Sequence, residues 1–385
     1  MIPYGRQDIS EEDIRAVVAV LGSDWLTQGP AIERFENAVA RHCGARYAVA
    51  VSNATAALHI ACLAADLKAG DTLWTSPNTF VASANCALYC GAQVDFVDID
   101  AQTYNLSVDA LEQKLARAAT AGRLPKVVIP VHFSGQSCEM SRIAELAAHY
   151  GFAVIEDASH AIGGRYRDAA VGSCMYSDMT VFSFHPVKIV TSGEGGMILT
   201  NRTDLYDILL RLRSHGITRD PALMEGPSDG PWYYQQIELG FNYRMTDIQA
   251  ALGASQMTRL DEFVERRQQL AQRYNEKLKL LPLTTPTVHQ DAYSAFHLYV
   301  IRLKLDAIKR TRLDVFEALR ERGIGVNLHY IPVHTQPYYR RMGFKAGDFP
   351  AAENYYREAI SLPLYFGLSE DQQDQVVEAL GEVLQ

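Results

Sequence analysis

A lysine beside a glycine-rich turn is the first residue whose position suggests chemistry. Lys188 closes the segment SFHPVK at the end of a predicted apolar strand, and the turn TSGEGG follows at residues 191–196. An amine held at the end of a buried strand can condense with an aldehyde as a Schiff-base lysine. A single lysine in such a place is more often a solvated surface charge, so Lys188 alone does not decide between the two.

A pair of carboxylates follows another apolar run. The segment VIEDASH, residues 154–160, ends a predicted strand in Glu156 and Asp157 and places His160 three residues after the second of them. Ligands of open α/β sheets bind beyond the carboxyl ends of the strands, so Asp157 is well placed to meet one. A helix-capping aspartate with a structural histidine explains the same pattern equally well.

The segment SNATAA, residues 52–57, lies between a predicted strand and a predicted helix. Its small side chains leave the N–H groups of the first helical turn open to a phosphate, and Thr55 adds a hydroxyl. An ordinary helix cap accounts for the segment about as well. Together with Asp157 and Lys188, however, it supplies what pyridoxal phosphate needs: a phosphate site, a partner for the pyridine nitrogen and an amine for the aldehyde.

Other chemistries lack their usual support in this sequence. The chain contains no GxGxxG, P-loop, HExxH or GxSxG motif. Its six cysteines form no CxxC pair, so we expect reduced, packed thiols, no metal site and a cytoplasmic location. The net charge of −9 argues against nucleic-acid partners. No apolar run approaches the roughly 18 residues of a membrane span, so we expect no membrane partner either.

The elements that must position these residues alternate between strands and helices. The chain has 385 residues, of which 48% are hydrophobic and 21% charged, as is usual for globular proteins. Strands are predicted at 47–51, 72–75, 94–97, 126–131 and 152–155, and helices at 54–66, 80–89, 106–119 and 140–150. This alternation indicates an α/β fold in which helices cover both faces of a mostly parallel sheet.

The rhythm changes after residue 180. Later elements are predicted as strands at 179–184, 196–200 and 296–303 and as helices at 205–214, 246–280, 311–322 and after 369. A Gly- and Pro-rich stretch at 219–232 is typical of a long functional surface loop. The long helix can bridge two domains, so we expect a large domain at 1–254 and a smaller α+β C-terminal domain at 255–385.

Five separated strings resemble the nucleotide-sugar aminotransferases of the DegT/DnrJ/EryC1/StrS family. They are SNATAALHIA (52–61), EDASHAIGG (156–164), SFHPVK with TSGEGG (183–196), GFNYRMTDIQAALG (240–253) and HYIPVHTQPYY (329–339). The strings follow the family's order over essentially the whole chain. The resemblance implies the PLP-dependent transferase fold of type I, as in aspartate aminotransferase, with an α/β/α large domain around a mostly parallel sheet and a smaller α+β domain.

The resemblance also implies which residues hold pyridoxal 5′-phosphate. Lys188 matches the lysine that binds the aldehyde, and Asp157 matches the carboxylate that pairs with the pyridine nitrogen. His160 matches a Gln or His beside the ring and its phenolic oxygen, and Phe80 falls where an aromatic residue stacks on the ring.

The phosphate contacts implied by the family come from two chains. Ala54 and Thr55 match the phosphate-binding turn, and Ser183 matches a further contact. Asn242 matches a residue that reaches the phosphate from the neighbouring subunit, which implies a homodimer with a shared active site. Arg244 is close to the same spot and is a candidate for binding the substrate.

Four further residues are candidates for binding the substrate. Trp232 and Tyr234 lie in or beside the long loop, where their rings either stack on a uracil or sugar ring or pack between subunits. His329 and Tyr330 belong to a loop that the family places near the mouth of the active site. The atoms that these two residues contact are left open.

Within the family the chain resembles the branch of pseudaminic acid biosynthesis, on MIPYGRQDISEEDI, FSFHPVK and LGFNYRMTDIQAAL. This implies transfer of an amino group from L-glutamate, by way of pyridoxamine 5′-phosphate, to C4 of a UDP-linked 4-keto-6-deoxy-N-acetylhexosamine. The implied product is UDP-4-amino-4,6-dideoxy-N-acetyl-β-L-altrosamine. Lys188 stands where a dehydrating branch has histidine, which favours transamination. The alternatives are another UDP- or dTDP-keto-sugar, aminated at C3 or C4, and a non-catalytic cofactor-binding scaffold.

Overall fold

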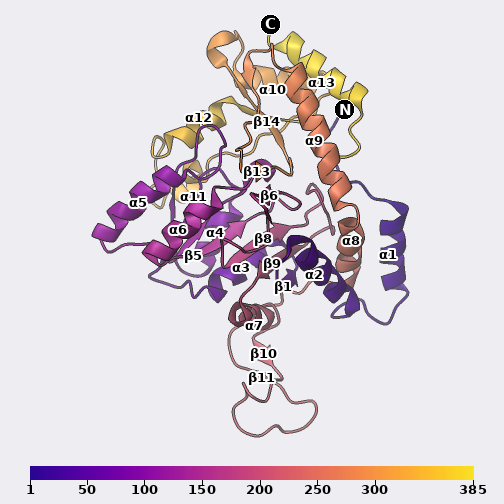
Figure 1. Cartoon of the computed structure of the whole chain (residues 1–385), viewed down its shortest axis with the longest axis vertical. Helices are drawn as coiled ribbons and strands as arrows, with labels where there is room; N and C mark the ends of the chain where they lie inside the picture. Colours follow the sequence, from indigo (N-terminus) through magenta and orange to yellow (C-terminus); the bar gives the residue numbers. More distant parts are fainter.

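A seven-stranded sheet with helices on both faces forms the larger part of the molecule (Figure 1). The structure is a computed structural model and describes all residues from Met1 to Gln385. The strands lie in the order β1-β9-β8-β5-β4-β2-β3. Their bounds are β1 (Tyr47–Val51), β2 (Thr72–Thr75), β3 (Gln93–Phe96), β4 (Val127–Ile129), β5 (Ala153–Asp157), β8 (Met179–Ser183) and β9 (Gly196–Thr200).

Most strand pairs of this sheet are parallel. The neighbours β3, β2, β4, β5 and β8 run in one direction, while β9 is antiparallel to both β8 and β1. The prediction of a mostly parallel sheet is therefore confirmed. Because parallel strands end at the same edge, Asp157 at the end of β5 and Ser183 at the end of β8 come to lie on one edge of the sheet.

Alternating side chains bury the two faces of the sheet in separate cores. In β1, Val49 and Val51 face a core shared with α3, α4 and α7, whereas Ala48 and Ala50 face a second core with α2 and α8. Helices α5 and α6 continue the cover of that second face. The bounds are α2 (Pro30–Cys43), α3 (Ala54–Ala64), α4 (Ala82–Tyr89), α5 (Val108–Thr120), α6 (Met140–Tyr150), α7 (Thr203–Leu212) and α8 (Asp247–Met257).

A smaller antiparallel sheet with its own core forms the C-terminal part. Its strand order is β12-β14-β15, and α9, α10 and α13 pack on it. Ile2 joins this core, so both chain termini lie at this end of the molecule (Figure 1). The bounds are α9 (Leu260–Lys277), β12 (Leu283–Thr284), β14 (Tyr299–Leu303), α10 (Arg312–Glu321), β15 (Ala359–Leu362) and α13 (Glu370–Val383).

The helix predicted from 246 to 280 is two helices, because α8 ends at Met257 and α9 begins at Leu260. Helix α9 carries Phe263 into the core of the large sheet and Leu270 into the core of the small one. A division close to this break agrees with the two cores. We propose 1–254 and 255–385 as the two domains, with Ile2 crossing over to the second.

The predicted loop at 219–232 forms the end of a thin arm. A two-stranded hairpin, β10 (Ile217–Thr218) and β11 (Gln235–Gln236), carries the loop away from the body of the molecule, at the bottom of Figure 1. None of the helices combines the length and the apolar character needed to cross a bilayer. The remaining elements, which were not predicted, are α1 (Glu11–Leu21), α11 (Pro337–Arg340), α12 (Pro350–Glu358), β6 (Arg165–Tyr166), β7 (Ala169–Ala170) and β13 (Ala292–Tyr293).

Candidate active site

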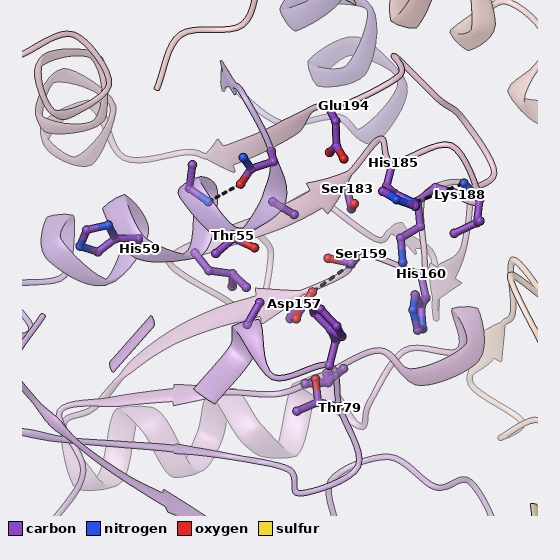
Figure 2. Close-up of a pocket in the computed structure, with 18 of the residues that line it drawn as sticks. Thr55, His59, Thr79, Asp157, Ser159, His160, Ser183, His185, Lys188 and Glu194 are labelled. Carbon is purple, nitrogen blue, oxygen red and sulfur yellow. Dashed lines mark hydrogen bonds between the residues drawn. The ribbon is translucent and has the colours of Figure 1, made fainter. Parts of the chain in front are cut away.

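A cavity of about 710 Å³ opens at the carboxyl ends of β5 and β8, beside the first turn of α3. Figure 2 shows Asp157 near its centre, Thr55 on one side, and Lys188 and His160 on the other. Nine of the predicted site residues line this one cavity: Ala54, Thr55, Phe80, Asp157, His160, Ser183, Lys188, His329 and Tyr330. The structure thus brings together residues that are up to 276 positions apart (330 − 54).

Helix α3 begins against the end of strand β1. Asn53 caps it, because its Oδ1 accepts a hydrogen bond from the N–H of Ala56 at 2.8 Å. The N–H groups of Ala54 and Thr55 have no partner within the helix, as in any first turn. Gly196 permits the close approach, since a Cβ there would lie 2.5 Å from the carbonyl carbon of Asn53. The positive end of the helix dipole therefore faces the cavity and favours an anion.

Asp157 is held as a hydrogen-bond acceptor. Its Oδ2 accepts a hydrogen bond from the hydroxyl of Ser83 at 2.5 Å, and its Oδ1 accepts one from the N–H of Ser159 at 3.1 Å. The carboxylate is buried, yet it lines the cavity. Hydrogen bonds donated to a carboxylate stabilise its charged form. Asp157 is therefore suited to pair with a protonated ring nitrogen.

Lys188 lies in the loop between β8 and β9 and is half-buried on the cavity wall. Asp157 is the one carboxylate whose charge acts on its amine. Burial lowers the pKa of Lys188 to about 8, and the negative charge of Asp157 offsets only part of this effect. A substantial fraction of the amine is consequently neutral near physiological pH, as a nucleophile or a base requires.

His160 and Tyr330 form a hydrogen-bonded pair on the same wall. The Nε2 atom of His160 lies 3.0 Å from the hydroxyl of Tyr330, and the N–H of Ser134 donates to Nδ1 at 3.2 Å. Burial and the charge of Lys188 lower the pKa of His160 well below its usual value. Burial likewise lowers the pKa of His329 to about 3. Both imidazoles are therefore neutral near physiological pH.

Four predicted residues do not line the cavity of their own chain. Asn242 pairs with Ser214 as an isolated bridge, and Arg244 donates to the hydroxyl of Ser214 at 2.9 Å. Trp232 and Tyr234 lie toward the end of the hairpin arm and are 69% and 51% exposed. Their roles at a site stay predictions.

Several lining residues escaped the sequence reasoning. His59 lies one helical turn after Thr55 on α3 and contacts the hydroxyl of Tyr243 at 3.2 Å, so helical periodicity could have found it. Glu194 also lines the cavity and lies within the glycine-rich turn TSGEGG, although it was not predicted as a site residue. Tyr4 carries no sequence signal, because only the pairing of the N-terminus with the C-terminal domain brings it to the cavity.

The donor set of this cavity fits pyridoxal phosphate. One end offers N–H groups and hydroxyls for a phosphate, the middle offers a buried carboxylate for a ring nitrogen, and the far wall offers an amine of lowered pKa. Phe80 supplies an aromatic face, 58% exposed, that lines the same cavity. No group of three or more His, Cys, Asp or Glu side chains in the structure is arranged to hold a metal ion.

Two curated relatives match the chain closely over nearly its full length. The spore coat polysaccharide biosynthesis protein SpsC of Bacillus subtilis is 41% identical over 386 residues, covering 100% of this chain and 97% of that protein. The UDP-4-amino-4,6-dideoxy-N-acetyl-beta-L-altrosamine transaminase of Campylobacter jejuni is 36% identical over 368 residues, covering 95% of this chain and 93% of the other.

Solved structures share the fold. PseC of Helicobacter pylori, an aminotransferase of pseudaminic acid biosynthesis, superposes with a TM-score of 0.90 at 28% identity and covers 100% of this chain and 99% of its own. The sugar aminotransferase Spr1654 of Streptococcus pneumoniae, in its PMP form, gives a TM-score of 0.89 at 28% identity over 100% and 99% of the two chains. Its PLP form gives 0.88 at 27% identity over 99% and 98%.

The family assignment follows from a match along the chain. Residues 7–381 match the DegT/DnrJ/EryC1/StrS aminotransferase family. This match and the structural likenesses confirm the predicted family, the type I fold and the cofactor. The chain belongs to the DegT/DnrJ/EryC1/StrS family and is a pyridoxal-phosphate-dependent sugar aminotransferase.

Proposed function

We propose that the protein transfers the amino group of L-glutamate to C4 of a UDP-linked 4-keto-6-deoxy-N-acetylhexosamine, giving UDP-4-amino-4,6-dideoxy-N-acetyl-β-L-altrosamine. The observation that carries the chemistry is the meeting of Lys188, Asp157 and the first turn of α3 in one cavity. The choice of sugar is supported by the names of the Campylobacter relative and of the Helicobacter structure. Lys188 stands where the dehydrating branch of the family has histidine, so its amine favours transamination over dehydration.

The chain's own residues have distinct tasks in this proposal. Bound pyridoxal phosphate supplies an electron sink for the carbanion that forms at the reacting carbon. The Asp157 carboxylate keeps the ring nitrogen protonated, and the N–H groups of Ala54 and Thr55 hold the phosphate together with the Ser183 hydroxyl. The Lys188 amine takes the proton from the reacting carbon of the donor and returns a proton to the sugar C4 in the second half-reaction.

A panel of substrates tests the choice of sugar. The purified protein is offered UDP- and dTDP-linked 4-keto-sugars and 3-keto-sugars with L-glutamate, and each product is identified by mass spectrometry and NMR. We expect the UDP-4-keto-6-deoxy-N-acetylhexosamine of L-arabino configuration to be aminated at C4 with the highest kcat/KM. Equal or better turnover of another keto-sugar would discard this substrate and leave the family chemistry standing. The panel must include other keto-sugars because SpsC, whose name specifies no sugar substrate, is more similar to this chain (41% identity) than the altrosamine transaminase is (36% identity).

We also propose a homodimer in which each site is completed by the other chain. Asn242 would reach the phosphate from the second chain, and Arg244, Trp232 and Tyr234 would contact the substrate from there. The supporting observation is that none of these four side chains lines the cavity of its own chain. Tyr243, which lies between Asn242 and Arg244 in the sequence, does line that cavity.

Mixing two inactive variants tests the shared site. We expect Lys188→Ala and Asn242→Ala to be much less active than the wild-type protein when each is alone. After unfolding and refolding together, the heterodimer contains one site with both native residues, so about a quarter of the wild-type activity should return in an equimolar mixture, by random pairing of the chains. Lack of any gain over the summed separate activities, with heterodimers shown by native mass spectrometry, would contradict the shared site.

The lowered pKa of Lys188 predicts how cofactor uptake depends on pH. Below pH 8 the amine is largely protonated and cannot attack the aldehyde. The rate at which the cofactor-free protein binds pyridoxal phosphate covalently should therefore rise about tenfold per pH unit and level off above pH 8. Stopped-flow visible absorbance measures this rate. A plateau reached only near the pKa of a free lysine would show that burial does not tune the amine.

A further inference from the structure

A buried arginine without an acidic partner lies behind the active site. Arg267 of α9 is 3% exposed, and its Nη1 lies within hydrogen-bonding distance of the carbonyl oxygens of Phe296, His297 and Leu364, at 3.2, 3.2 and 3.0 Å. Its Nε atom has no partner. A buried guanidinium without a carboxylate costs folding free energy. We therefore expect Arg267 to have a role other than stabilising the fold.

The backbone that Arg267 holds is strained and locked to a second strained segment. Phe296 has φ +45° and Ser134 has φ +62°, in the region that side chains rarely adopt. Gly135, at φ +105°, packs so tightly that a Cβ would lie 2.7 Å from the nitrogen of Phe296. Ser134 donates its hydroxyl to the carbonyl of Leu298 at 2.7 Å. The two segments thus fix each other's geometry.

This locked geometry determines which nitrogen of His160 carries the proton. The N–H of Ser134 points at Nδ1, and a backbone N–H can only donate, so Nδ1 is the acceptor. The neutral ring then carries its proton on Nε2 and donates it to the oxygen of Tyr330 at 3.0 Å. The buried ring of His297, 4.5 Å away, packs against His160.

We propose that Arg267 is a positioning residue: through the 296–298 segment and Ser134 it holds His160 in the Nε2–H tautomer, which frees the hydroxyl proton of Tyr330 for donation into the cavity. Burial raises the pKa of Tyr330 far above neutrality, so that proton is retained. An oxygen of the cofactor or of the keto-sugar is the acceptor, and this last part rests on the proposed function. The C-terminal domain would thereby control a hydrogen bond at the reacting end of the site.

Nitrogen NMR of the full-length, cofactor-bound protein tests the proposal. With ¹⁵N-labelled histidine, the signals of His160 are assigned by their loss in His160→Gln. We expect the Nε2–H tautomer in the wild-type protein and a mixture of tautomers in Arg267→Met. The variant should also lose about tenfold in kcat with little change in KM, because a misplaced donor weakens the transition state more than binding. Arg266→Met is the matched control, since Arg266 precedes Arg267 on the same helix and donates a hydrogen bond to the carbonyl of Leu368 instead of the 296–298 segment.

Two outcomes would overturn the proposal. One is an Nδ1–H or doubly protonated His160 in the wild-type protein. The other is a folded Arg267→Met whose His160 signals match those of Arg266→Met. If Arg267→Met does not fold, Ser134→Ala removes the link to Leu298 instead and should broaden the same signals; unchanged signals there would likewise reject the mechanism. A failed sugar panel leaves these spectra unaffected, so the two proposals fail separately.

Discussion

Lys188→Ala is expected to abolish transamination while leaving the fold and the phosphate site intact. The amine is the only lysine side chain that lines the cavity, and its pKa of about 8 leaves it partly neutral at physiological pH. Removing a positioned proton carrier costs roughly 10²- to 10⁴-fold in rate. Loss of the covalent link to the cofactor adds to this, so turnover should fall by at least about 10³-fold.

Two measurements separate the chemical effect from a structural one. The wild-type protein with pyridoxal phosphate should show the visible absorbance of a lysine-bound cofactor, and L-glutamate should bleach it. The variant should bind the cofactor without that absorbance and should not be bleached. Lys304→Ala is the control, since Lys304 is exposed and does not line the cavity. Sustained turnover of keto-sugar by Lys188→Ala would show that another group moves the proton.

The sequence allowed the chemistry to be predicted where the residues that act together lie in short motifs. Asp157 was predicted because it follows a run of apolar residues that is typical of a buried strand. Thr55 was predicted because it lies in the first turn of a helix that follows a strand. Helix α6 was predicted at its observed bounds because apolar residues recur along Met140–Tyr150 at helical spacing.

Contacts between distant residues escaped prediction for a physical reason. Ser83 lies 74 positions before the carboxylate that it contacts, and Tyr330 lies 170 positions after His160. No local pattern encodes such pairs, because the crossovers of the sheet and the docking of the C-terminal domain create them. The break between α8 and α9 was missed because no Gly or Pro marks Thr258 and Arg259; both helices pack on the core of the large sheet there.

The two N-terminal helices, by contrast, carry start signals in the local sequence. Ser10 forms a capping box with Asp13, and Pro30 starts α2, so both helix starts were readable. The pocket residue His59 belongs to this group as well. Some unpredicted elements and residues thus carry a local signal in the sequence, whereas the long-range contacts carry none.

Asp157→Asn is expected to retain the cofactor and to lose about 10²- to 10³-fold in kcat, the range found when one preorganised electrostatic contact is removed. The amide keeps the size of the side chain and can still accept the hydrogen bond from Ser83, so the fold should be preserved. It cannot balance a positive charge on the ring nitrogen, so the ring becomes a weaker electron sink. Ser83→Ala, which removes one hydrogen bond to the carboxylate, should lie between wild type and Asp157→Asn.

A chemical rescue distinguishes this electrostatic role from simple positioning. A cofactor analogue methylated on the ring nitrogen carries a permanent positive charge and no longer needs a carboxylate to hold a proton there. Asp157→Asn loaded with this analogue should regain much of its rate of bleaching by L-glutamate, whereas the wild-type protein should gain nothing. If the analogue gives no rescue although it binds, Asp157 acts by orienting the ring, and the buried hydrogen bond from Ser83 then serves geometry instead of charge.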